Sequence, residues 1–231
     1  SLRSDIQALK QGSRNLNDGV SMINSAEGAM SEQASILIRL RELSSQAATG
    51  TIGQAERVTL NLEFSALKAE FDRIAGVVEF NGQKLLDGSL SASSGNNIIL
   101  QIGLNSDEAN RINLNQEIDL TAVTSRALGF NASNVSTDTS ALRAMDNLTD
   151  AIDKLIDLRG RVGAIQNRLK HAFNNLQSSI EGLTQAVSTI RDADLAEEFA
   201  TLTKNQILVQ AGAAMVGQAN LIPQSVLTLL Q

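Results

Sequence analysis

The stretch that decides the fold is residues 139–190, TSALRAMDNLTDAIDKLIDLRGRVGAIQNRLKHAFNNLQSSIEGLTQAVSTI. Its apolar residues recur at steps of three and four, and no proline interrupts them. They are Leu142, Met145, Leu148, Ile152, Leu155, Leu158, Val162, Ile165, Leu169, Phe173, Leu176, Ile180, Leu183, Val187 and Ile190. This spacing predicts a helix with one narrow apolar stripe. At a rise of about 1.5 Å per residue the helix would be roughly 75 Å long, so it needs other long helices beside it.

Two more stretches, residues 1–49 and 54–78, predict helices with the same periodicity. The first carries Leu2, Ile6, Leu9, Leu16, Val20, Ile23, Met30, Leu37 and Leu40, and the second carries Leu60, Phe64, Leu67, Phe71, Ile74 and Val78. Between them Gly50 is placed to end the first helix. Gly12, Gly19 and Gly28 each cost about 1 kcal/mol relative to Ala inside a helix. They are either tolerated weak points or places where a neighbouring helix approaches closely.

The period changes after the second helix. Residues 80–83, Phe-Asn-Gly-Gln, carry the Asn-Gly signal of a tight hairpin, and residues 87–88, Asp-Gly, are a second turn. Residues 89–97 form a loop rich in Ser, Gly and Asn. Alternating apolar residues then predict strands over 98–104 and 112–120. A polar linker over 131–137 leads into the long helix.

The predicted fold is therefore mainly α: an elongated rod of long antiparallel helices with a small β-hairpin region at one end, plus a C-terminal helix. We expect residues 1–190 to form the rod, with the β region at about 79–137, and residues 191–231 to form a separate helical segment. A narrow core has a high ratio of surface to volume, which predicts modest stability for a single copy.

The last predicted helix runs from about residue 195 to about 221, where Pro223 ends it. No charged residue follows Lys204. A monomer gains nothing by exposing an apolar helix to water, so we expect copies of the chain or a partner to bury it. The apolar residues expected to form this polymer core, or to bind a chaperone, are Leu195, Phe199, Leu202, Ile207, Leu208, Val216, Leu221, Val226, Leu227 and Leu230.

Composition excludes several function classes. The net charge of -6 and the absence of Trp and Tyr argue against nucleic-acid binding. No Cys is present, His171 is the only histidine, and no phosphate-binding loop occurs, so we expect no metal, no cofactor and no enzyme activity. The carboxylate pairs Asp192 with Asp194 and Glu197 with Glu198 suit the first turns of a helix better than catalysis. No stretch predicts a membrane span.

Five motifs together resemble bacterial flagellin, and the resemblance spans the chain. They are residues 17–21 (NDGVS), 26–30 (AEGAM), 39–43 (RLREL), 80–86 (FNGQKLL) and 218–227 (QANLIPQSVL). The resemblance implies a secreted structural subunit of the flagellar filament at the cell surface. Its implied partners are copies of itself, an export chaperone that wraps the terminal segment, and the hook-associated and cap proteins.

The sequence departs from the family pattern in three ways. We expect a further N-terminal segment to precede Ser1, and the large variable outer domains are absent. The resemblance also implies that Arg39, Arg41, Glu42 and Leu43 pack between subunits or face an innate immune receptor. Ile38 stands where receptor-activating flagellins carry Gln, so subunit packing is the stronger expectation. The alternatives are a flagellin-like surface protein that binds polysaccharide or a host receptor through the β region and the loop of residues 89–97, and a hook–filament junction protein.

Overall fold

The computed structural model describes residues 2–229, with side chains for residues 2–191 and 197–219. The chain divides into two compact units: Ser4–Ile180, and Ser1–Arg3 with Glu181–Gln231. The predicted boundary near residue 190 between rod and terminal segment stays a prediction.

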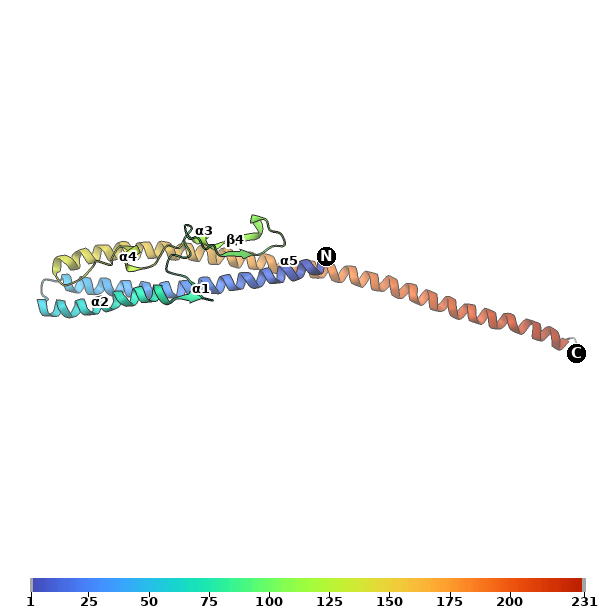
Figure 1. Cartoon of the computed structure of the whole chain (residues 1–231). Coiled ribbons are helices and arrows are strands. Elements are labelled where there is room, and N and C mark those ends of the chain that lie inside the picture. The colour runs from blue at the N-terminus through green and yellow to red at the C-terminus, as the bar shows by residue number, and fades with distance from the viewer. Residues whose placement is uncertain (1, 230–231) are drawn as a thin grey trace. The chain divides into compact units, whose positions relative to one another are not determined.

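Three long helices dominate the chain (Figure 1): α1 (Leu2–Ala48), α2 (Gln54–Val77) and α5 (Asp138–Leu229). Within the Ser4–Ile180 unit, α1 lies beside both other helices. Arg159 of α5 donates to Glu27 of α1, and Gln166 donates to Asn24, so the two helices run antiparallel. The prediction of long antiparallel helices is confirmed.

The core follows the predicted stripes closely but not completely. Leu148, Leu155 and Leu169 of α5 are at most 1% exposed. Leu142 and Ile190 are each 55% exposed, so their place in the stripe was wrong. At the start of α5 the buried positions are instead alanines, at Ala141, Ala144 and Ala151. Together with Leu148 and Leu155, these alanines form one buried stripe with steps of three and four residues. A pattern search that counts only large apolar residues overlooks the alanines.

α5 also differs from prediction in its length. It continues through residues 191–195 and past Pro223 to Leu229, where a break and a stop were expected. Residues 191–195 contain neither Gly nor Pro, so nothing there ends a helix. Proline removes one main-chain hydrogen bond, and a helix can continue past it. Gly50 is not in the left-handed conformation of a helix cap, because the positive φ angles among the glycines occur at Gly82, Gly88 and Gly129.

The β region consists of two small antiparallel pairs. β1 (Glu79–Phe80) pairs with β2 (Gln83–Lys84) through the predicted turn, where Asn81 has φ 50° and Gly82 has φ 78°. Positive φ at both central residues defines a type I′ turn. β3 (Ile99–Gln101) pairs with β4 (Arg111–Asn113), with Leu100 opposite Ile112, after the 3-10 helix η1 (Glu108–Asn110).

The predicted strand over 112–120 is only partly correct. After β4 the chain forms helix α3 (Leu114–Ile118), and Asn113 caps it by accepting the N–H groups of Asn115 and Gln116. Leu114 and Ile118 are four residues apart, which is one helical turn rather than an alternation. A further short helix, α4 (Ser125–Leu128), was not predicted; Thr124 caps it.

Residues 120–137 then return along the rod as an extended strap, interrupted only by α4. Side chains of all three long helices bond to it at intervals. The contacts are Gln33 to Val123, Asp72 to Ser125, Lys154 to Leu128, Lys68 to Asn131 and Ser133, Asn61 to Val135, and Gln54 to Ser136. The strap buries Leu128, Phe130 and Val135. It therefore covers core surface that the three helices leave open.

Two of the helix glycines, Gly12 and Gly19, are explained by β3 and the residue that follows it rather than by a neighbouring helix. A Cβ at Gly12 would lie 2.6 Å from the carbonyl oxygen of Ile102, and one at Gly19 would overlap Leu100. Asn15, between them on the same face, donates to the carbonyl of Gln101 at 2.9 Å. Gly28 has no atom within 4 Å of the corresponding position. The expected close approach is thus real at two glycines, but it is made by β3 at Gly19 and by the residue after β3 at Gly12.

Gly12 has a close neighbour and Gly28 has none, which predicts opposite effects on stability when each is replaced by alanine. We expect Gly12→Ala to destabilise the Ser4–Ile180 unit by about 1–3 kcal/mol, since the main chain of Ile102, directly after β3, has to move. Gly28→Ala should stabilise it by about 0.5–1 kcal/mol, because it gains helix propensity at no steric cost. Urea unfolding followed by circular dichroism measures both, and equal shifts for the two variants would contradict this account.

Candidate interaction surfaces

The motif over residues 39–43 lies on α1 beside α2. Arg39 donates to Glu63 of α2 at 2.7 Å and to Glu42 at 3.3 Å. The hydrogen bonds that Arg39 donates to the Glu63 carboxylate, and then the one it donates to Glu42, raise the pKa of Arg39. The Arg39 guanidinium is therefore already held by two carboxylates of its own chain.

Only part of this motif forms a surface. Arg41 and Glu42 are exposed, and Ile38 beside them is 48% exposed. Leu43 is 1% exposed and lies in the core, so it was wrongly grouped with surface contacts. Successive helix residues point about 100° apart, and a five-residue stretch cannot present every side chain to one partner.

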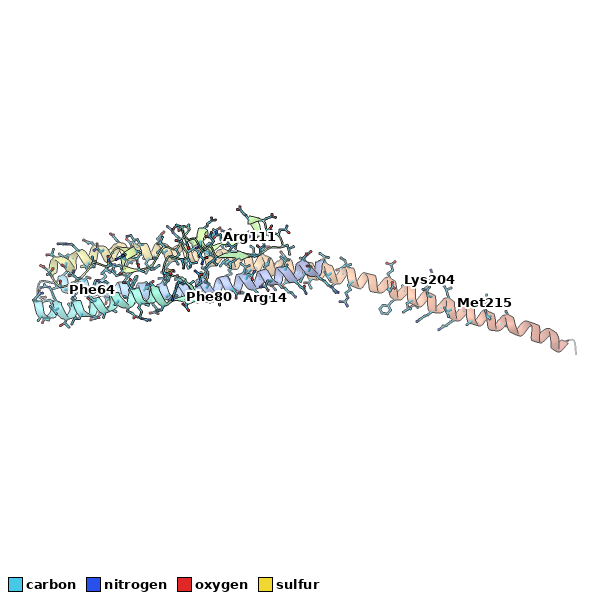
Figure 2. The ribbon with its side chains drawn as sticks, viewed as in Figure 1. Arg14, Phe64, Phe80, Arg111, Lys204 and Met215 are labelled. Atoms are coloured by element: carbon cyan, nitrogen blue, oxygen red, sulfur yellow. The ribbon has the colours of Figure 1, made fainter. Side chains whose placement is uncertain are left out.

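The second surface is the part of α5 from residue 197 to 219, described on its own. Every side chain in this range is exposed. The exposed fractions of the predicted residues are 61% for Phe199, 51% for Leu202, 60% for Ile207, 59% for Leu208 and 63% for Val216. Figure 2 shows Lys204 and Met215 on this segment; Val209 and Met215, which we did not predict, are exposed by 72% and 74%.

The other predicted residues of this segment cannot be placed. Leu195, Leu221, Val226 and Leu227 lie outside the residues whose side chains are described, and Leu230 lies outside the described chain. The same holds for Asp192 and Asp194, whereas Glu197 and Glu198 are exposed.

Two grooves lie against the β region of the Ser4–Ile180 unit. One, of about 680 Å³, is lined by Asp18, Gly19, Met22, Phe80, Asn81, Gln83, Ile98 and Leu100. The other, of about 520 Å³, lies between Leu9, the β3–β4 connection and residues 172–179 of α5. The linings are mainly apolar and amide side chains, without the paired acid and base that catalysis requires.

The described side chains contain no group of three potential metal ligands. His171 is exposed on α5, as expected for a histidine without a site. Within residues 2–229, no helix is both long and apolar enough to cross a bilayer.

Comparison with known proteins decides the family. Residues 1–91 match the model of the bacterial flagellin N-terminal helical region, and residues 145–230 match that of the bacterial flagellin C-terminal helical region. Flagellin of Halalkalibacterium halodurans is 40% identical over 230 residues, which cover 100% of this chain and 81% of that protein. The chain belongs to the bacterial flagellin family. Flagellin FlaB2 of Treponema pallidum is 39% identical over 241 residues, covering 100% of this chain and 82% of that protein.

Solved structures agree with this assignment. The crystal structure of Bacillus cereus flagellin superposes with a TM-score of 0.60 and 31% identity, over 71% of this chain and 88% of that one. A putative flagellar hook-associated protein of Vibrio parahaemolyticus gives a TM-score of 0.65 over 81% of this chain and 93% of that one. Its identity is only 11%, so it shows a shared fold and nothing more.

As a flagellin, the chain is a structural subunit of the flagellar filament, which lies outside the cell and serves motility. It is not an enzyme. The relatives that match its full length are flagellins and filament core proteins, which favours this role over the hook–filament junction.

Sequence reasoning missed the ion pairs that cross the flagellin rod. Glu27 with Arg159 and Glu117 with Arg168 join elements that are far apart in the chain. Asn115, buried among the carbonyls of the 89–97 loop, was also missed. A polar residue between apolar ones at 114 and 118 was the available signal, since polar groups inside a core need hydrogen-bond partners.

Proposed function

We propose that residues 197–219 of α5 form part of the packed interior of the filament, and that Arg41, Glu42 and the exposed part of Arg39 pack between neighbouring rods. The first assignment depends on one observation. Large apolar side chains are exposed on this helix within the described chain, in a segment with no charge after Lys204.

The arrangement of these side chains around the helix indicates that neighbours cover it from several directions. Ile207, Leu208 and Val209 are consecutive, and consecutive helix residues point about 100° apart. Three such side chains therefore span more than half of the helix circumference. A single partner helix would cover only one stripe, so several neighbours are needed to bury this segment.

Before assembly the same surface would need protection. An export chaperone that wraps the helix would cover it, and the absence of charge after Lys204 fits such a client. The hook-associated and cap proteins would contact the flagellin at the ends of the filament.

Receptor recognition by the 39–43 motif is not part of this proposal. Arg39 is bonded to Glu63 and Glu42, and Leu43 is buried. Packing between subunits requires only the exposed remainder of the motif.

The test is Ile207→Glu in cells that export this chain as their filament subunit. We expect filaments to be absent or strongly shortened in electron micrographs, because a buried unpaired carboxylate is costly. Ile207→Leu, which keeps the apolar surface, should assemble normally. The unfolding of the Ser4–Ile180 unit should be the same in both variants. Filaments of normal length from the Glu variant would refute the proposal, and unchanged chaperone affinity would remove its chaperone part.

A further inference from the structure

The tip of the β1–β2 hairpin holds the only Asn-Gly pair of the chain, Asn81 and Gly82. We propose that Asn81 is a site of spontaneous covalent modification, at which the folded protein loses ammonia and acquires aspartate or isoaspartate. The proposal does not depend on how subunits pack in the filament.

The reaction needs only the chain and water. The main-chain nitrogen of Gly82 gives up its proton to solvent base and bonds to Cγ of Asn81. The Cγ–Nδ2 bond breaks, and the nitrogen leaves as ammonia, so a five-membered succinimide ring closes. Water then opens the ring at one of its two carbonyls. One opening gives aspartate, and the other gives isoaspartate, in which the main chain runs through the former side chain.

The structure leaves the attacking nitrogen accessible. Asn81 and Gly82 are both exposed. Gly82 has no Cβ, and no atom lies within 4 Å of the position that a Cβ would occupy. A side chain at residue 82 would hinder ring closure, and here neither the residue nor its surroundings provide one.

The side chain of Asn81 is also free to reach the reactive geometry. No hydrogen bond to its amide occurs among the described residues. Three other asparagines are held in place: the oxygens of Asn61, Asn113 and Asn134 accept main-chain N–H groups of Val135, Asn115 and Ser136. Those bonds keep the side-chain carbonyl in one orientation, so ring closure there first requires a bond to break.

The hairpin itself gives little protection. Its ladder has two residue pairs, Glu79 with Lys84 and Phe80 with Gln83. A two-stranded ladder this short is marginally stable, so its tip opens often compared with the helical core. The left-handed conformation of Asn81, at φ 50°, can therefore relax without unfolding the rod.

Modification would change the groove beside the hairpin. Asn81 and Asp18 both line it, so a new carboxylate would give it a second acid. Isoaspartate also adds one main-chain atom to a two-residue turn, and turn length fixes the strand register. We therefore expect loss of the Glu79–Lys84 ion pair, which spans 3.0 Å in the unmodified hairpin.

The experiment is to incubate the purified full chain at mildly alkaline pH, in native buffer and in urea. Peptide mass spectrometry follows each asparagine, and enzymatic isoaspartate methylation identifies the product. We expect Asn81 to convert first in native buffer, well ahead of exposed Asn105, which is followed by Ser106. The native rate should lie within several-fold of the rate in urea and should rise with pH.

Two variants keep the test specific. Gly82→Ala should slow conversion even if the strain of its φ of 78° opens the hairpin, because the added methyl group hinders ring closure. Asn81→Gln should slow it as well, since a six-membered ring closes less readily, and neither should alter Asn105. The proposal is overturned if Asn81 stays intact in native buffer while it converts in urea, or if Asn105 converts as fast.

Discussion

Phe71→Ala is expected to lower the free energy of unfolding of the Ser4–Ile180 unit by about 3–5 kcal/mol, the range for removing a buried aromatic ring. Phe71 is 0% exposed and meets Phe130 of the strap edge to face, with ring centroids 5.1 Å apart and an angle of 79°. Removing one ring therefore weakens two layers, α2 and the strap.

The position of Phe71 explains why the loss should be near the upper part of that range. Its main-chain carbonyl accepts a hydrogen bond from the buried Nε2 of Gln33, which also donates to the carbonyl of Val123. If α2 moved to fill the cavity left by the ring, these hydrogen bonds would be strained. A narrow core cannot collapse freely around a void.

Urea unfolding measures the change, and Leu62→Ala is the matched control. Leu62 is on the same helix and is 68% exposed, so its removal should cost less than about 0.5 kcal/mol. A loss below about 1 kcal/mol for Phe71→Ala would show that the strap does not depend on this pair of rings.

Asn115→Ala is expected to destabilise the β region by about 2–6 kcal/mol, the sum for four hydrogen bonds of about 0.5–1.5 kcal/mol each. Asn115 is 0% exposed. Its Nδ2 donates to the carbonyls of Ser89, Ser91 and Asn96, at 2.8, 3.1 and 3.2 Å, and its Oδ1 accepts the N–H of Ile98 at 2.8 Å. One side chain thus organises the whole 89–98 loop.

Asn97→Ala is the control, because Asn97 is exposed in the same loop and should have little effect. Hydrogen exchange localises the change: the amide of Ile98 should lose protection in the Asn115 variant, while the core amides of α1 keep theirs. Equal exchange at Ile98 in both variants would contradict the role given to Asn115.

The sequence predicted what depends on local periodicity. The apolar steps in residues 1–49 and 54–78 gave helices with nearly correct ends, and Asn81 with Gly82 gave the hairpin. The steps in residues 139–190 gave the start of α5 but not its end. The motif resemblance gave the family and the function. Both kinds of signal are contained in short stretches of chain.

What the sequence could not predict depends on residues far apart. Lys68 looks like a surface charge beside Glu63, yet its ammonium group bonds to the carbonyls of Asn131 and Ser133. Gly12 and Gly19 pointed to a close contact, but only the fold shows that β3 and the residue after it make this contact. Leu43 matched a surface motif and is buried, because the motif does not state which residues face inward.

The strap has a mechanical consequence for a subunit that carries load in a rotating filament. Its carbonyls are held by Lys68 and Lys154, from two different helices, at separate points along the rod. A force that slides α2 past the first half of α5 pulls on these attachments together, in shear, and not one after another as in peeling. The strap, although it has little regular secondary structure, should therefore resist axial sliding of α2 against α5, because its cross-links to both helices share the load.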